Sequence, residues 1–156
     1  MYAGRVNLDV DLTGEYELRC TLERTDKIVT RSRLACSWLR GAIRDSIEAG
    51  GRVTVTLHWQ ALGPIERNYQ VFVHLYDGEL WAQHDGAPAC AIWPTTRWEP
   101  GQIVADPHIV KLPAEMPDGP MPVLVGLYDL LTEDRLPVNG DPDGVLRLVE
   151  IDIVSG

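Results

Sequence analysis

The chain has 156 residues, of which 45% are hydrophobic and 24% are charged, and its formal net charge at pH 7 is −9. This length and composition are typical of one globular domain. The acidic charge argues against nucleic acid as a partner, because nucleic-acid binding depends on clustered lysine and arginine side chains. The chain contains no run of about 18 or more apolar residues, so we expect no direct membrane insertion of this chain.

The first two predicted strands form a hairpin. Residues 5–12 and 16–22 both alternate between apolar and polar side chains, and 13–15 lie between them. Pairing across a three-residue loop would place Leu12 opposite Tyr16, so that the apolar faces of the two strands coincide.

Residues 53–59 give the clearest strand, because every second residue is apolar and most of the run is β-branched. One segment, 38–49, suits a short helix. Many short strands without helical crossovers predict an all-β fold, an antiparallel β-sandwich of about eight to ten strands that is immunoglobulin-like or jelly-roll-like. Further strands are expected at 27–34, 70–76, 80–84, 108–112, 122–128 and 145–154.

The stretch 71–86, VFVHLYDGELWAQHDG, predicts a hairpin around its Asp-Gly dipeptide, which is typical of a two-residue turn. With that turn, His74 faces Trp81 and the two should pack together. His74 and His84 then point to opposite faces of the sheet and cannot share a metal ion. Asp85 would lie about 13 Å from His74 along the strands. A three-residue loop would instead place both histidines on one face, about 7 Å apart.

The stretch 139–150, NGDPDGVLRLVE, nearly matches the spacing of a calcium-binding loop. An EF-hand has a helix on each side of the loop, whereas here Pro137 precedes it and a β-branched run follows. A turn before the last strand is therefore the favoured interpretation. We expect no metal and no cofactor.

Catalytic signatures are weak. No GxSxG motif is present, so nucleophilic catalysis by a serine has no support. Asp85 and Asp106 bracket one long loop, and two carboxylates about 5–9 Å apart would suit glycoside hydrolysis. Structural hydrogen bonds, in which these carboxylates accept from backbone N–H groups of the loop, are the favoured interpretation. We expect no catalytic residue, with a hydrolase using Asp85 and Asp106 as an alternative.

The connection at 86–105, GAPACAIWPTTRWEPGQIVA, is long and contains three prolines and two tryptophans. Loops of this length are usually functional or cover an open end of the sheet. We expect Trp98 to fold back over the core, because a Glu-Pro-Gly turn follows it, and Trp93 to point outward, because Pro94 holds its backbone extended. The candidate ligand-binding residues are Trp93, Arg97, Trp98, Asp85 and Asp106.

Four segments resemble the soluble C-terminal β-sandwich module that follows the membrane-spanning part of some bacterial glycosyltransferases, which look like dolichyl-phosphate-mannose–protein mannosyltransferases. The segments are GGRVTVTLHWQAL (50–62), YQVFVHLYDGELWAQHDGAP (69–88), PTTRWEPGQIVAD (94–106) and VGLYDLLTEDRLPV (125–138). In that family the module is not the transferase active site. The resemblance implies an extracytoplasmic accessory domain.

Residues 1–32 lie outside this resemblance, which is weaker from about 33 to 49. The expected organisation is one β-sandwich domain over 1–156, with an N-terminal hairpin in 1–32 and the sandwich in 33–156. The expected function is a non-catalytic accessory or binding module whose partner is a glycan or a protein. A structural docking domain of a larger membrane glycosyltransferase is the second alternative beside the hydrolase.

Overall fold

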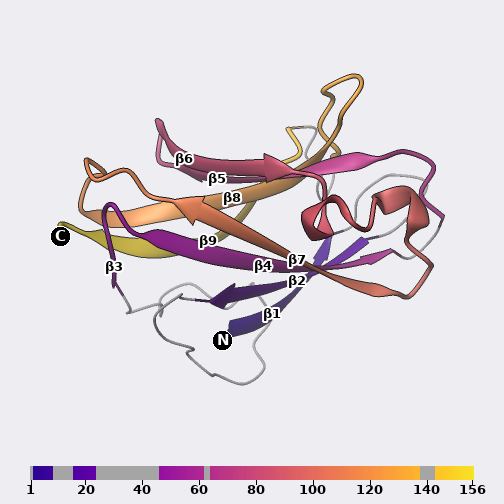
Figure 1. Cartoon of the computed structure of the whole chain (residues 1–156), viewed down its shortest axis with the longest axis horizontal. Coiled ribbons are helices and arrows are strands. Elements are labelled where there is room, and N and C mark those ends of the chain that lie inside the picture. Colours follow the sequence, from indigo (N-terminus) through magenta and orange to yellow (C-terminus); the bar gives the residue numbers. More distant parts are fainter. Residues whose placement is uncertain (1, 9–15, 24–45, 62–63, 138–142) are drawn as a thin grey trace.

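The described residues form two β-sheets (Figure 1). The computed structural model describes residues 2–8, 16–23, 46–61, 64–137 and 143–156. Two single-turn segments, η2 (Ala89–Ala91) and η3 (Thr95–Arg97), lie between β6 and β7. The strands are β1 (Tyr2–Leu8), β2 (Tyr16–Glu23), β3 (Ser46–Glu48), β4 (Arg52–Ala61), β5 (Tyr69–Tyr76), β6 (Leu80–Gly86), β7 (Ile103–Lys111), β8 (Gly119–Asp129) and β9 (Leu146–Val154).

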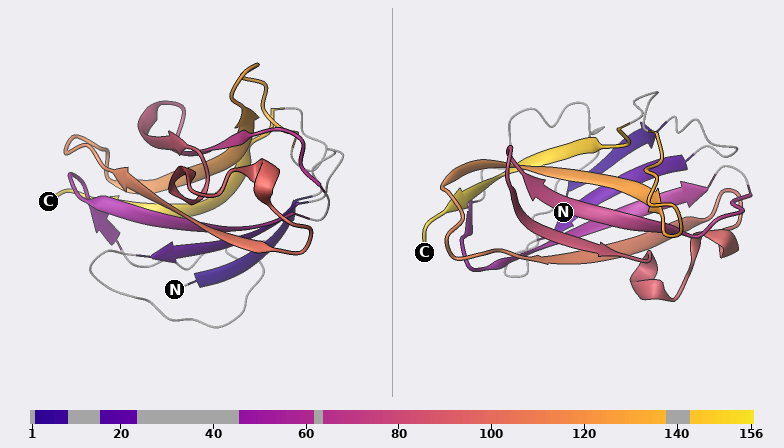
Figure 2. Two further views of the ribbon diagram at one scale, coloured as in Figure 1. Left: turned by 45° about the vertical axis from the view of Figure 1, so that its right-hand side comes forward. Right: turned by 90° about the horizontal axis from the view of Figure 1, so that it is seen from above.

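The sheets have the strand orders β1-β2-β4-β7 and β3-β9-β8-β5-β6. All neighbouring strands are antiparallel except β3 and β9. Figure 2 shows the two sheets as facing layers, and one of them is strongly curled. The expected all-β, sandwich-like fold is confirmed, and the described residues contain nine strands. No helix in the described part of the chain has the length and apolar character that a membrane span requires.

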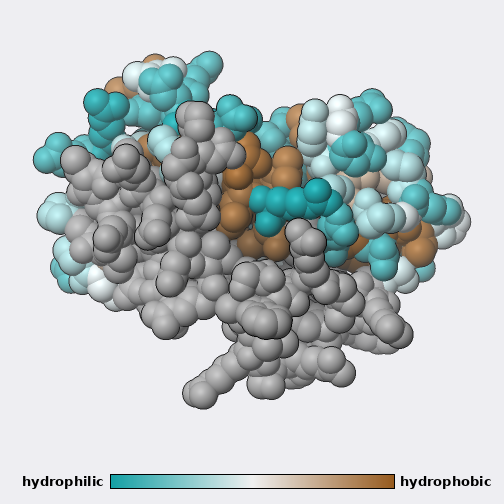
Figure 3. Space-filling model, turned by 180° about the vertical axis from the view of Figure 1, so that it is seen from behind, coloured by the Kyte–Doolittle hydropathy of each residue, from teal (hydrophilic) through white to brown (hydrophobic). Residues whose placement is uncertain are grey.

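The core lies between the sheets, and strict alternation builds it. On β4, the side chains of Val53, Val55, Leu57 and Trp59 are fully buried, as the sequence predicts. The inward positions of β5, β8 and β9 meet them from the other sheet. Seen from behind, hydrophobic side chains gather near the centre of the surface and hydrophilic ones along the upper rim (Figure 3).

The N-terminal hairpin exists, but its predicted register is wrong. Leu8, not Leu12, pairs with Tyr16, so the pairing lies four residues earlier in the first strand. Because this shift is even, apolar positions still face apolar positions. β2 then pairs with β4, which makes the hairpin part of the four-stranded sheet.

Two other predicted elements fall partly or wholly outside the described residues. These are the strand at 27–34 and residues 38–45 of the predicted helix. In the remainder of that predicted helix, Ser46–Glu48 is strand β3, which pairs with β9. Here the buried Ile47 alternates with two exposed neighbours, so burial between sheets overrides the weak helical pattern.

The hairpin of β5 and β6 corrects a second predicted register. Its loop has three residues, 77–79, and the pairing next to the loop contains a bulge between Leu75 and Tyr76. As a result, His74 lies opposite Gln83. His74 consequently does not pair with Trp81. Its Nε2 lies 3.0 Å from Asp85 Oδ1, far closer than the predicted spacing. The three-residue loop and the bulge each shift the pairing by one residue, so together they do not change which residues share a face. His74 and His84 therefore still point to opposite faces, as predicted.

Candidate functional site

Three connecting segments gather at one end of the sandwich, where β4 and β8 end and β5 and β7 begin. We call these segments, 64–69, 87–102 and 129–136, the loop end. They present large apolar side chains to solvent: Leu131 is 91% exposed and Ile92 is 75% exposed, with Leu130 and Trp93 exposed beside them in the sequence. Leu130 and Leu131 lie on one of these segments and Ile92 and Trp93 on another, and exposed apolar residues of this kind are candidates for an interaction site.

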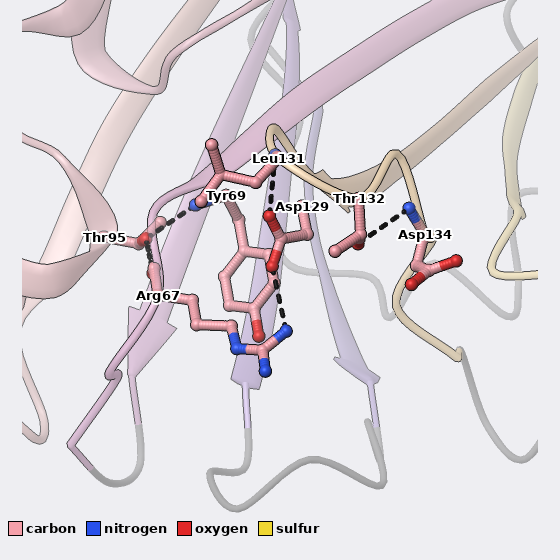
Figure 4. A network of polar contacts seen from close by, with 7 residues as sticks. All are labelled: Arg67, Tyr69, Thr95, Asp129, Leu131, Thr132 and Asp134. Atoms are coloured by element: carbon pink, nitrogen blue, oxygen red, sulfur yellow. Dashed lines mark hydrogen bonds and ion pairs between the residues drawn. The ribbon is translucent and has the colours of Figure 1, made fainter.

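Thr95 ties two segments of the loop end together. Its side chain is fully buried, and Oγ1 donates to the carbonyl oxygen of Arg67 at 2.7 Å while accepting from the backbone N–H of Tyr69 at 3.0 Å (Figure 4). Thr96 Oγ1 adds a hydrogen bond to Asn68 Oδ1 at 2.8 Å. The loop that carries Ile92 and the segment that enters β5 are therefore fixed to each other.

Asp129 fixes the third segment. Figure 4 shows its carboxylate between the backbone of Leu131 and the guanidinium group of Arg67. Oδ1 accepts from the N–H of Leu131 at 2.8 Å, and Oδ2 accepts from Arg67 Nη1 at 3.0 Å. The Leu131 N–H lowers the pKa of Asp129 most, and the bond from Arg67 also lowers it, against an opposing effect of burial. The ionised carboxylate thus holds the turn that projects Leu131.

The two loop tryptophans take opposite positions, as expected. Trp98 is buried and packs on Trp59, with 6.4 Å between ring centroids, and its Nε1 donates to the carbonyl oxygen of Trp93. Trp93 is 37% exposed, and its Nε1 makes a long bond of 3.4 Å to Gln102 Oε1. Arg97 is exposed. The roles of these three residues in binding stay predictions.

Segment η2 has a rare backbone conformation. Ala89, Cys90 and Ala91 have φ values of 51°, 55° and 64°, so three successive L-residues adopt the left-handed region. Such residues cost roughly 1–2 kcal/mol each. The N–H of Ala89 donates to Asp106 Oδ1 at 2.8 Å, which anchors the start of this turn to β7.

Asp106 belongs to a chain of four polar side chains, which we call the histidine chain: Trp59, Asp106, His108 and His84. Asp106 Oδ2 accepts from Trp59 Nε1 at 2.9 Å and lies 2.7 Å from His108 Nε2. The Nδ1 atoms of His108 and His84 are 2.9 Å apart. Asp106 and His108 are buried between the sheets, whereas His84 is exposed at the edge strand β6.

Partial burial of the ring lowers the pKa of His84, although the residue as a whole is exposed, and the adjacent His108 lowers it further. Asp106 and Asp85 act in the opposite direction. On balance, neutral imidazole is favoured at this position. The histidine chain therefore leads from the interior to the neutral imidazole of His84, which faces solvent.

The structure does not bring the two candidate carboxylates together. Asp85 points to the outer face of its sheet, where it bonds to His74, and Asp106 points into the core. Sequence reasoning missed His108, although its two-residue spacing from the buried Val110 signals that both share a face. It also missed Thr95 and Leu131, for which the sequence holds no clear signal.

The predicted calcium-loop stretch is only partly visible, because 139–142 lie outside the described residues. Glu150, the expected last ligand, forms an ion pair with Arg147. Within the ranges that the structure describes, no three His, Cys, Asp or Glu side chains are arranged to hold a metal ion.

Comparison with models of known protein families gives no match to this chain. Comparison with curated protein sequences gives no match either.

Proposed function

We propose that the protein is a non-catalytic accessory module that binds a protein partner through the loop end. The observation that carries this proposal is the exposure of Leu131 and Ile92 on segments whose backbones are fixed by buried or partly buried hydrogen bonds. A fixed backbone has little conformational entropy to lose on binding, so more of the interaction energy appears as affinity.

The chemistry of the exposed side chains favours a protein over a glycan. Leu130, Leu131 and Ile92 offer apolar area but no hydrogen-bonding groups for sugar hydroxyls. The only ring that a sugar would stack on here, among the described loop-end residues, is Trp93, and about two thirds of it is already covered. The same segments also expose polar residues, including Asn68, Thr96, Arg97 and Glu99. Protein interfaces typically combine apolar and polar residues of this kind.

The resemblance to the accessory module of bacterial membrane glycosyltransferases supports the same proposal and suggests the partner. In such an arrangement the loop end would contact the extracytoplasmic surface of the transferase. A docking role and an accessory role then become one function. The hydrolase alternative loses support, because Asp85 and Asp106 point in different directions.

Site-specific photo-crosslinking tests the proposal. A benzoylphenylalanine residue replaces Leu131 in one variant and Ile92 in another, and Leu80 in a matched control. Leu80 is also exposed, at 46%, but it lies beside the 77–79 loop at the opposite end of the sandwich. We expect both loop-end variants to crosslink the same membrane glycosyltransferase when the two are expressed together, and the Leu80 variant to give background labelling.

Equal crosslinking from all three positions, or none from position 131 or 92, would contradict the proposal. A glycan array on the unmodified protein provides the second readout. A glycan signal that is lost in Trp93→Ala, in a protein that crosslinks nothing, would replace the protein partner with a carbohydrate.

A further inference from the structure

The histidine chain contains a contact that depends on the number of protons it holds. Asp106, as a carboxylate, accepts from Trp59 Nε1, from Ala89 N–H and from His108 Nε2. This arrangement places a proton on His108 Nε2. The remaining nitrogen of His108, Nδ1, faces Nδ1 of His84 at 2.9 Å. Two ring nitrogens at this distance form a hydrogen bond only when a single proton lies between them.

Successive protonation steps therefore have different effects. In the neutral pair, His84 Nδ1–H donates to His108 Nδ1, and His84 Nε2 carries a lone pair. A first added proton binds at Nε2 of His84 and leaves the contact intact. A second added proton gives both rings an N–H at Nδ1, so two donors and two positive charges oppose each other. The contact must then break.

This contact joins the edges of two different sheets. His84 lies on β6, an edge strand of the five-stranded sheet, and His108 lies on β7, an edge strand of the four-stranded sheet. The same Asp106 that orients His108 also holds the N–H of Ala89 at the start of the left-handed turn η2. Left-handed alanine is unfavourable by itself, so η2 needs stabilising contacts: the side-chain anchor from Asp106 and the backbone hydrogen bonds of Ala91 and Ile92 within the turn.

We infer that the His84–His108 contact is an acid-sensitive latch between β6 and β7, and that its opening releases η2 and the adjacent apolar residues of the loop end. The second half of the inference rests on the proposed function, because it makes the latch a regulator of the docking surface. Above pH 6.5 the loop end is held in its docking conformation, and in acid it is released.

The charged groups around the latch are consistent with opening in acid. Across the strands, His84 faces Val73 on β5 and His108 faces Val55 on β4, so neither neighbouring strand supplies a charge directly opposite. Asp106 and Asp85 are the nearby carboxylates, and η2 contributes only the N–H of Ala89. Burial and His108 still lower the pKa of His84 below 6.5. This lowered pKa gives stability that is present above pH 6.5 and is lost as His84 takes up the first proton, which leaves the contact intact. The second proton, which opens the contact, must join a pair that already carries one positive charge, so opening requires a lower pH than the first step.

Amide hydrogen exchange on the isolated chain tests the latch without any partner. The protection factor of the Ala89 amide is followed from about pH 7.5 to about pH 4.5, beside amides of the β4–β7 ladder. One pH unit changes a one-proton equilibrium about tenfold, so we expect Ala89 protection to fall by about tenfold per pH unit in the acid range. The ladder amides should keep their protection over the same range.

The matched variants are His84→Asn and His74→Asn. An asparagine amide donates from a position close to Nδ1 but does not titrate, so His84→Asn should retain Ala89 protection in acid. His74→Asn removes a histidine from the outer face of the same hairpin and should behave like the wild type. Parallel loss of protection at Ala89 and in the ladder would indicate unfolding of the whole domain and overturn the latch.

The imidazole nitrogen shifts of the wild type give a second readout that needs no variant. The latch requires two separate protonation steps for the pair, with Ala89 released at the second. Independent, superimposed titrations of His84 and His108 near pH 6.5 would overturn it. Either negative result leaves the crosslinking test of the loop end unaffected, because that test is performed at neutral pH.

Discussion

Two histidine–aspartate pairs of the same chemistry occupy contrasting environments. In the first, His108 and Asp106 lie 2.7 Å apart with side-chain exposures of 1% and 0%. In the second, His74 and Asp85 lie 3.0 Å apart on the outer face, with exposures of 18% and 35%. Asp106 also accepts bonds from Trp59 and from the Ala89 backbone, whereas Asp85 retains access to water.

The two pairs have similar contact distances but contribute differently to stability. A similar contact distance gives an exposed pair little net stability, because water and salt compete with it. The buried pair excludes water, so removing one partner leaves the other donors unsatisfied. For that reason the buried pair can connect a protonation event to a backbone segment, and the exposed pair cannot.

The largest expected difference in stability is between removal of the buried carboxylate and removal of the exposed one. Asp106→Ala leaves two buried donors and one partly buried donor without an acceptor and should lower the free energy of unfolding by about 3–5 kcal/mol. Asp85→Ala should lower it by less than about 1 kcal/mol. Urea denaturation at pH 7 measures both. Similar losses in the two variants would remove the distinction between the pairs.

The loop tryptophans extend the same contrast to apolar side chains. Trp98→Ala removes a buried ring that packs on Trp59 and should destabilise the protein by about 3–5 kcal/mol. Trp93→Ala should cost less, about 1 kcal/mol, because the residue is partly exposed and its backbone carbonyl still accepts from Trp98. Thermal or urea unfolding distinguishes the two. A large loss in both would mean that the loop is a lid over the core.

Asp129 provides a carboxylate at the loop end, with a lowered pKa of its own. Its ordinary value is 3.8, so the stability that it contributes is present above that pH and is lost as pH falls through its lower folded-state pKa. Asp129→Asn should be less stable at pH 7 and should show a smaller further loss below pH 3.8. Thermal melts as a function of pH test this, with Asp134→Asn as the control for an exposed carboxylate in the same turn. Equal acid sensitivity in all three proteins would contradict it.

The smallest effect concerns salt. Raising sodium chloride from about 0.05 M to about 1 M shortens the screening length from above 10 Å to about 3 Å. The stability difference between wild type and Asp85→Asn should therefore shrink further from its already small value. The difference for Asp106→Asn should hardly change, because ions do not reach the buried carboxylate. A strong salt dependence at Asp106 would show that its site is open to solvent.

The strands that the sequence predicts best are those in which alternation and β-branched residues agree. Val53, Val55 and Leu57 follow that rule, and β4 forms as expected. The start of β7 is placed too late, because Asp106 and Pro107 are typical of a loop. The contacts to Trp59, Ala89 and His108 make an aspartate acceptable inside the sandwich, and the first two come from segments distant in sequence.

The register of the strands and the contacts within the site depend on turns and bulges that the apolar–polar alternation of the sequence does not reveal. The pairing of His74 with Asp85 follows from a three-residue loop plus a bulge, and an Asp-Gly dipeptide alone favours a shorter turn. Thr95 resembles any loop threonine until the segment of Arg67 is folded against it. The aspartates and tryptophans are visible in the sequence as candidates, but their separation into buried and exposed groups requires the tertiary fold.

The left-handed turn at Ala89–Ala91 reverses a familiar ranking of amino acids. Glycine usually weakens a folded segment relative to alanine, because it adds freedom to the unfolded chain. At positive φ the steric penalty of a methyl group is the larger effect, so glycine becomes the better residue. A protein engineer who replaced Cys90 by glycine would therefore relieve strain and remove an exposed thiol with one change.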